Sequence, residues 1–77
     1  MTAKVEYGRE ALTPEVVAII EWERAVASAR AAKAYREGAA HVRMYSVVRA
    51  RGLEARARAA EREVEEYADR ALAAMRG

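Results

Sequence analysis

Small and apolar residues recur along the last third of the chain at alternating steps of four and three. The members of this series are Leu53, Ala57, Ala60, Val64, Tyr67, Ala71 and Ala74. Such spacing holds one stripe of an α-helix toward the same side turn after turn. We therefore predict a helix over residues 53–75. Its stripe has little bulk and must be met at close range by another helix.

A second apolar stripe predicts an earlier helix over about residues 14–37. Its start is marked by Thr13, which can cap, by Pro14, which fits the first helical position, and by Glu15, which is favourable near the positive end of the helix dipole. The apolar positions of the stripe are Leu12, Val16, Ile19, Trp22, Val26 and Ala29. The larger side chains are confined to the N-terminal half of this helix.

The segment between the two helices carries the weakest pattern. Gly38 predicts a break, because glycine is the usual residue just past a helix C-terminus. Residues 41–48 are rich in valine and could form a strand, but alanine and arginine flank them, and we favour helix over about residues 40–75. Gly52 is a possible second break in that stretch.

Together these elements predict an all-α fold, a long helical hairpin of two to three helices that associates into a dimeric helical bundle. Residues 1–12 are expected to form an irregular N-terminal arm, with a short strand over residues 4–7 as an alternative, and residues 13–77 a single helical domain.

Composition strengthens the expectation of self-association. Leu, Ile, Val and Phe together supply 13 of 77 residues, whereas alanine supplies 20. Alanine is the strongest helix former, but a chain this short with so little bulk builds only a thin core. Association with another chain is the simplest way to add buried surface.

Candidate protein-interface residues come from both apolar stripes and from the intervening segment. They are Val16, Ile19, Trp22, Val26, Val48, Leu53, Ala57, Ala60, Val64, Tyr67, Ala71 and Leu72. The sequence leaves open whether the second stripe packs on the chain's own first helix or on another chain. Trp22 is either an ordinary core aromatic or, if exposed, an interface anchor.

Basic residues concentrate in the middle of the chain. Residues 39–60 contain five arginines and one acidic residue, whereas residues 61–77 contain three arginines and five acidic residues. The five are Arg43, Arg49, Arg51, Arg56 and Arg58. They allow three interpretations, namely nucleic-acid contact, a solubilising surface, or head-to-tail pairing with the acidic tail of a second chain. On a helix Arg49 and Arg56 share one side and Arg51 and Arg58 another, so no single cationic stripe results.

Candidate chemistry is sparse. The chain has no cysteine and no phosphate-binding glycine loop, and it has a single histidine, His41, four residues after Glu37. We predict a non-enzymatic interaction protein with no catalytic, cofactor or metal site. Its partners would be itself, as a homodimer or higher oligomer, and another protein, with nucleic acid as the alternative. No apolar run is long enough to span a membrane, and a cytoplasmic location is the expectation.

Overall fold

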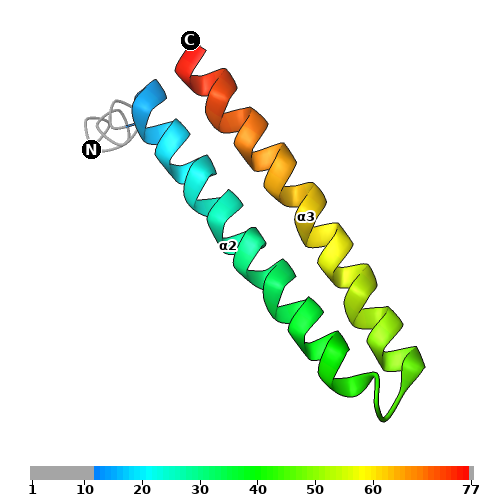
Figure 1. Ribbon diagram of the computed structural model, residues 1–77. Helices are drawn as coiled ribbons and strands as arrows, with labels where there is room; N and C mark the ends of the chain where they lie inside the picture. The colour runs from blue at the N-terminus through cyan, green and yellow to red at the C-terminus, as the bar shows by residue number, and fades with distance from the viewer. Residues whose placement is uncertain (1–11, 77) are drawn as a thin grey trace, which may run out of the picture.

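The computed structural model describes residues 12–76 as an antiparallel hairpin of two long helices. Helix α2 covers Pro14–Val42 and helix α3 covers Val47–Arg76. Figure 1 shows the helices side by side, with the start of α2 and the end of α3 at one end of the hairpin and the connecting turn at the other. We call these the open end and the turn end. The predicted all-α hairpin is confirmed. Of the predicted arm at residues 1–12, residues 1–11 lie outside the described residues, and so does the alternative strand over residues 4–7.

Helix α2 begins where the sequence predicts. The Thr13 hydroxyl oxygen accepts a hydrogen bond from the Val16 backbone N–H at 3.3 Å, and Pro14 and Glu15 occupy the first turn. These three residues satisfy free N–H groups and complement the dipole at the start of a 29-residue helix.

The predicted break at Gly38 is wrong. Helix α2 continues through Gly38 to Val42, and the chain reverses at residues 43–46. This turn contains neither glycine nor proline; it is stabilised by Ser46, whose hydroxyl oxygen accepts from the Arg49 N–H at 3.2 Å. The Gly38 Cα instead faces α3, where an added Cβ would lie 3.5 Å from Leu53 Cδ1.

Packing explains where the turn falls. Ala39 and Ala50 are 2% and 1% exposed, and they are the last and first fully buried alanines on either side of the turn. Ending α2 at Gly38 would remove Ala39 from the helix and from the buried core. The chain therefore retains helical structure for one further turn.

The other uncertain positions contain neither a second break nor a strand. Helix α3 passes through Gly52 without a break, so the alternative with three helices does not occur among the described residues. Residues 41–48 divide between the end of α2, the turn and the start of α3, and no strand forms in the described part of the chain.

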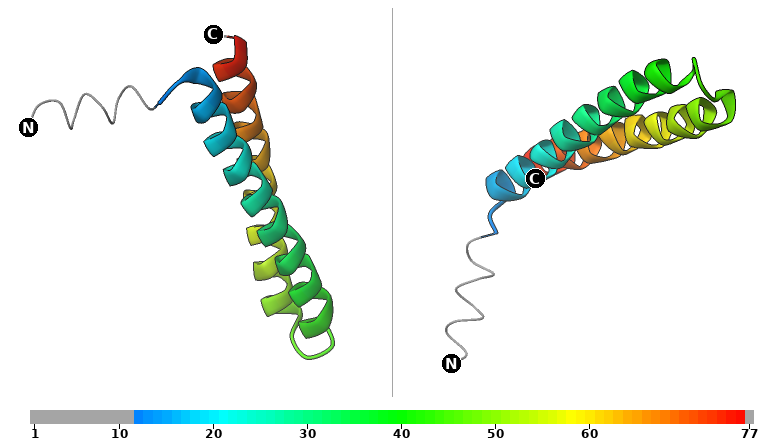
Figure 2. Two further views of the ribbon diagram at one scale, coloured as in Figure 1. Left: turned by 90° about the vertical axis from the view of Figure 1, so that its left-hand side faces the viewer. Right: turned by 90° about the horizontal axis from the view of Figure 1, so that it is seen from below.

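The core between the helices consists of alanine. In α2 the buried alanines are spaced by seven residues, at Ala18, Ala25, Ala32 and Ala39. In α3 they are Ala50, Ala57, Ala60 and Ala71. Methyl groups alone separate the two backbones at these positions, which lets the helices approach closely along their full length. Figure 2 shows the result from two further sides, as a single pair of helices with nothing covering its outer faces among the described residues.

Candidate protein-interaction surface

The largest apolar side chains of the hairpin lie on its outside. Near the open end, Ile19 and Trp22 are each 56% exposed, Leu72 is 50% exposed and Met75 is 73% exposed. These four side chains line one hollow, which Glu15 and Glu23 border. We call them the Trp22 patch. The arrangement is unusual, because Ile, Leu and Met are among the residue types most often fully buried in folded proteins.

The Trp22 patch is one end of a longer surface, which we call the lateral groove. Further hollows follow along the same side of the hairpin toward the turn, lined in succession by Ala29 and Val64, by Ala40 and Arg43, and by Val47 with Arg43. The last three hollows share lining residues with their neighbours, whereas the Trp22 hollow shares none with the next. Together the four hollows follow one side of the seam between the two helices from the open end to the turn end. Its geometry suits an elongated partner such as another helix.

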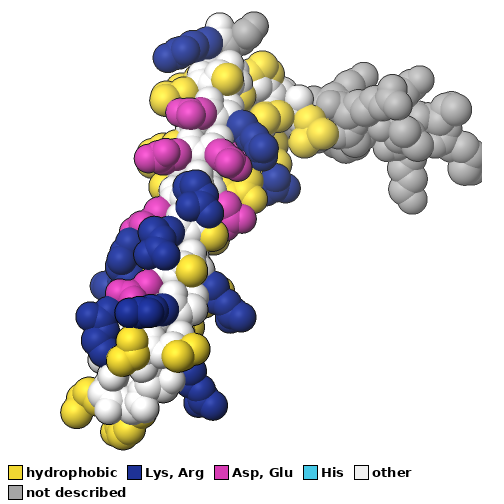
Figure 3. All heavy atoms as spheres, turned by 90° about the vertical axis from the view of Figure 1, so that its right-hand side faces the viewer, with side chains coloured by type: hydrophobic (Ala, Val, Ile, Leu, Met, Phe, Trp, Pro, Cys, Tyr) yellow, Lys and Arg dark blue, Asp and Glu magenta, His cyan; other side chains and the backbone are white. Residues whose placement is uncertain are grey.

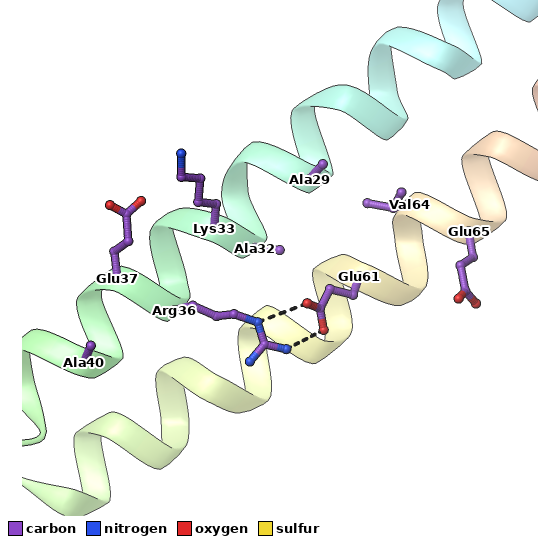
Figure 4. Close-up of a pocket in the computed structure, with 9 residues that line it drawn as sticks. All are labelled: Ala29, Ala32, Lys33, Arg36, Glu37, Ala40, Glu61, Val64 and Glu65. Carbon is purple, nitrogen blue, oxygen red and sulfur yellow. Dashed lines mark hydrogen bonds and ion pairs between the residues drawn. The ribbon is translucent and has the colours of Figure 1, made fainter.

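Two ion pairs of the same kind cross the lateral groove one heptad apart. Arg36 donates two hydrogen bonds to Glu61, from Nε to Oε2 at 3.0 Å and from Nη2 to Oε1 at 2.6 Å (Figure 4). Arg43 Nη2 donates to Glu54 Oε2 at 2.5 Å. A step of seven forward in α2 thus matches a step of seven backward in α3, which is the register of an antiparallel pair.

The bidentate contact changes the acid–base properties of both partners. The hydrogen bonds from Arg36 lower the pKa of Glu61 below its usual value, and the same contact raises the pKa of Arg36. Both groups thus stay charged over a wider pH range. In Figure 4 these two side chains reach toward one another, whereas Lys33 and Glu37 point outward from α2 and Glu65 points outward from α3.

The opposite side of the hairpin carries a different polar cluster around Glu21. This residue is 9% exposed and interrupts the series of buried alanines in α2. Arg24 Nη1 donates to Glu21 Oε1 at 3.3 Å, and Arg70 Nη1 lies 3.9 Å from Glu21 Oε2. Both guanidinium groups also lie over the Tyr67 ring, at 6.0 and 5.5 Å from its centroid.

The predicted interface residues separate into two groups. Those of the second stripe face α2 and are buried or half-buried, namely Leu53, Ala57, Ala60, Val64, Tyr67 and Ala71. Val16 is half-buried. Those left exposed are Ile19, Trp22, Val26, Val48 and Leu72. In the described hairpin the second stripe packs against the chain's own first helix and the Trp22 side chain is exposed, whereas contact of either surface with another chain remains a prediction.

The five candidate arginines do not form one surface. Arg51 lines the lateral groove, and Arg56 lines a hollow on the opposite side of the hairpin with Tyr35 and Ala60. Arg43 is paired with Glu54. The remaining two, Arg49 and Arg58, are exposed on α3. Arg51 and Arg56 thus line different sides of the hairpin, in agreement with their predicted separation.

Other chemistry has little support in the described part of the chain. No group of three or more His, Asp or Glu side chains is placed to hold a metal ion there. His41 lies beside Tyr45 at the turn, with 6.0 Å between ring centroids. Within residues 12–76, neither helix has the combination of length and apolar character needed to cross a bilayer.

Comparison of the chain with protein-family models, with curated proteins and with solved structures found no match. The features of the hairpin that bear on function are its exposed Trp22 patch and the lateral groove on the same side.

Sequence reasoning missed the surface that α2 presents to α3. Its signal was present as four alanines spaced by exact heptads, with a single charged residue, Glu21, three positions after the first. The apolar stripe that contains Trp22 was predicted to face a partner because its side chains are large, but at the same spacing it continues into Lys33 and Arg36. Only the alanine stripe runs the whole length of the helix and can meet α3 throughout.

Proposed function

We propose that this chain is a small non-enzymatic assembly protein that works through helix–helix contacts, first with a second copy of itself and then with a helix of another protein. The observation that carries the proposal is that the small side chains lie inside the hairpin and the large apolar side chains lie outside. Alanine fills the inside of the hairpin, whereas Trp22 and its neighbours are half exposed on the outside.

Energetics favour covering the Trp22 patch. Fully burying one large apolar side chain is worth about 1.5–3 kcal/mol. The four side chains of the patch each retain half or more of their exposure, so covering them offers on the order of 3–6 kcal/mol per copy. A small hairpin with an alanine core has little stability to spare, and association that buries this surface stabilises the fold by mass action.

The test uses Trp22 as both probe and target, because it is the only tryptophan in the chain. We expect light scattering to give the mass of a dimer or larger at about 50 mM and at high salt, since apolar contacts do not weaken with salt as phosphate contacts do. Tryptophan emission should shift to shorter wavelength as protein concentration rises, because association buries the indole.

A matched pair of variants localises the contact. Trp22→Glu should give a monomer with unchanged helix content. Ala34→Glu places the same charge at an exposed position of α2 that lines none of the hollows of the groove, and it should leave the mass unaltered. A wild-type monomer at every concentration, with constant tryptophan emission, would refute self-association.

One observation favours nucleic-acid binding as a second candidate function. The hairpin brings the arginine-rich start of α3 alongside Arg30, Lys33 and Arg36 of α2. Against this, the arginines lie on both sides of α3 and two basic side chains are engaged in ion pairs. If this function holds, affinity for a DNA or RNA probe should fall steeply with salt and should be abolished by Arg51→Glu combined with Arg58→Glu.

A further inference from the structure

Folding separates charge along the long axis of the hairpin. The turn half, residues 30–60, contains eight Lys and Arg against two Glu, a formal net charge of +6 with His41 neutral. The open half, residues 12–29 and 61–76, contains eight Asp and Glu against four Arg, a net of −4. Figure 3 shows basic side chains gathered toward the turn and acidic ones toward the open end on the face that it presents.

The lateral groove carries this separation on its borders. Its internal ion pairs neutralise Arg36, Arg43, Glu54 and Glu61. Among the described residues, six charged side chains line the groove without an ion-pair partner. Two basic side chains and one acidic side chain lie in the turn half, whereas all three in the open half are acidic. They are Lys33, Glu37 and Arg51 in the first, and Glu15, Glu23 and Glu65 in the second.

We propose that the lateral groove receives a second copy of the chain in antiparallel orientation, so that the basic turn half of each copy lies along the acidic open half of the other. This inference rests on the self-association proposed above and specifies its geometry. The two copies would be related by a two-fold axis across the middle of the groove and would form a four-helix bundle.

Charge complementarity selects this arrangement over the alternatives. A parallel pair would place +6 against +6 and −4 against −4. Two copies joined only through their Trp22 patches would place the two acidic halves together. The antiparallel pair alone sets opposite signs against each other, and like charges in contact are what specific interfaces avoid. It also brings the exposed Val47 and Val48 of one copy toward the Trp22 end of the other.

The chain has no cysteine, so single introduced cysteines give unambiguous labelling sites for distance measurement. Met44 is 83% exposed at the turn end and Ala73 is exposed at the open end. Spin labels on Met44→Cys and Ala73→Cys can be measured by double electron–electron resonance in the full-length protein. Because α2 is about 43 Å long at 1.5 Å per residue, the two ends are well resolved.

The antiparallel dimer predicts a distance of roughly one helix length, about 40–45 Å, between two Met44→Cys labels and also between two Ala73→Cys labels. A mixed dimer with one label of each kind should give a short distance, on the order of 20 Å, since neighbouring helices pack about 10 Å apart. Short distances between identical labels at both ends would show a parallel dimer and overturn the inference while leaving self-association intact.

Two further outcomes would also overturn it. Short distances between Ala73→Cys labels, with Met44→Cys labels roughly two helix lengths apart, would show docking through the open ends alone. A monomeric mass without any dipolar signal would refute the orientation and the self-association together, and salt-sensitive binding of a nucleic-acid probe by that monomer would assign the basic half to the alternative function.

A charge reversal tests the same inference by the sign of its effect. Arg51→Glu should weaken the antiparallel dimer about tenfold at low salt, because it sets a new acidic group against an acidic half. In a parallel dimer the same change would relieve repulsion and tighten association. Arg49→Glu makes an equal change in net charge at an exposed position that lines none of the hollows of the groove, and its effect should be several-fold smaller.

Discussion

The charged residue within the alanine core leads to a counter-intuitive prediction, that removing its charge stabilises the hairpin. The Glu21 side chain is 12% exposed, and its Oε2 atom has no hydrogen-bond partner among the described residues. Its two arginine neighbours are 57% and 59% exposed, so each contact is worth about 0–1 kcal/mol. Burying a carboxylate costs several kcal/mol when it is fully removed from water. The contacts do not offset that cost.

We therefore expect Glu21→Met to raise the free energy of unfolding by about 1 kcal/mol, at the low end of the range for replacing buried ionic groups by apolar ones. Methionine keeps the aliphatic stem and has a helix propensity close to that of glutamate. For a domain of this size the midpoint of thermal unfolding should rise by about 4–8 °C. Circular dichroism with heat and with urea, at one fixed protein concentration, measures both quantities.

Two further variants make the reasoning refutable. Glu63→Met, the same replacement at an exposed position of α3, should change stability by no more than about 0.5 kcal/mol. Arg70→Ala should destabilise the wild type, because Glu21 loses a counter-charge, yet it should be nearly neutral in the Glu21→Met background. If Glu21→Met destabilises the protein by 1 kcal/mol or more, the arginine contacts outweigh desolvation and the argument is wrong.

Three other predictions concern the core, an ion pair and a helix interior. Ala57→Leu should destabilise the hairpin by about 1–3 kcal/mol in urea unfolding, because Ala57 is 0% exposed and the helices must separate to admit a larger side chain. The control Ala55→Leu, on the exposed face of α3, should be nearly neutral. The folded-state pKa of Glu61 is depressed, so the stability that this carboxylate contributes is present above its ordinary pKa of 4.5 and is lost as the pH falls through the depressed value. The difference in unfolding free energy between wild type and Glu61→Gln should therefore shrink in acid. A difference that stays constant down to pH 2 would contradict this. Gly52→Ala should stabilise the fold by about 0.5–1 kcal/mol in thermal unfolding, since Gly52 is helical and an added Cβ meets nothing within 4 Å. A loss of stability would show that α3 requires the glycine.

Sequence spacing predicted the helices and the inner face of α3, because both depend on local rules. The series from Leu53 to Ala74 has an unbroken three–four period with charges on the other side, and one side of a helix with this pattern is bound to be covered. The start of α2 was equally predictable, since Thr13, Pro14 and Glu15 act through contacts within one turn. The hairpin follows once two long helices share a chain of this length.

The turn and the cross-helix contacts could not be predicted in the same way. Gly38 is a strong local stop signal, yet the burial of Ala39 and the packing of Gly38 against Leu53 outweigh it, and both depend on a register that only the folded hairpin defines. The pairs Arg36–Glu61 and Arg43–Glu54 join residues 25 and 11 positions apart. No spacing rule within one helix connects them.

The choice of inner face on α2 is the point at which sequence reasoning and structure differ most, and the difference itself bears on function. A rule that buries the bulkiest stripe would place Ile19 and Trp22 against α3. The structure buries the alanines because close approach along the entire helix, repeated over four heptad positions, yields more continuous contact than a bulky stripe that ends at Lys33. The bulky stripe is then free to face outward. A helix with two usable faces, one narrow and one broad, can close a hairpin with the first and meet a second chain with the other. This division of roles between the two faces of α2 is the physical basis for proposing an assembly protein.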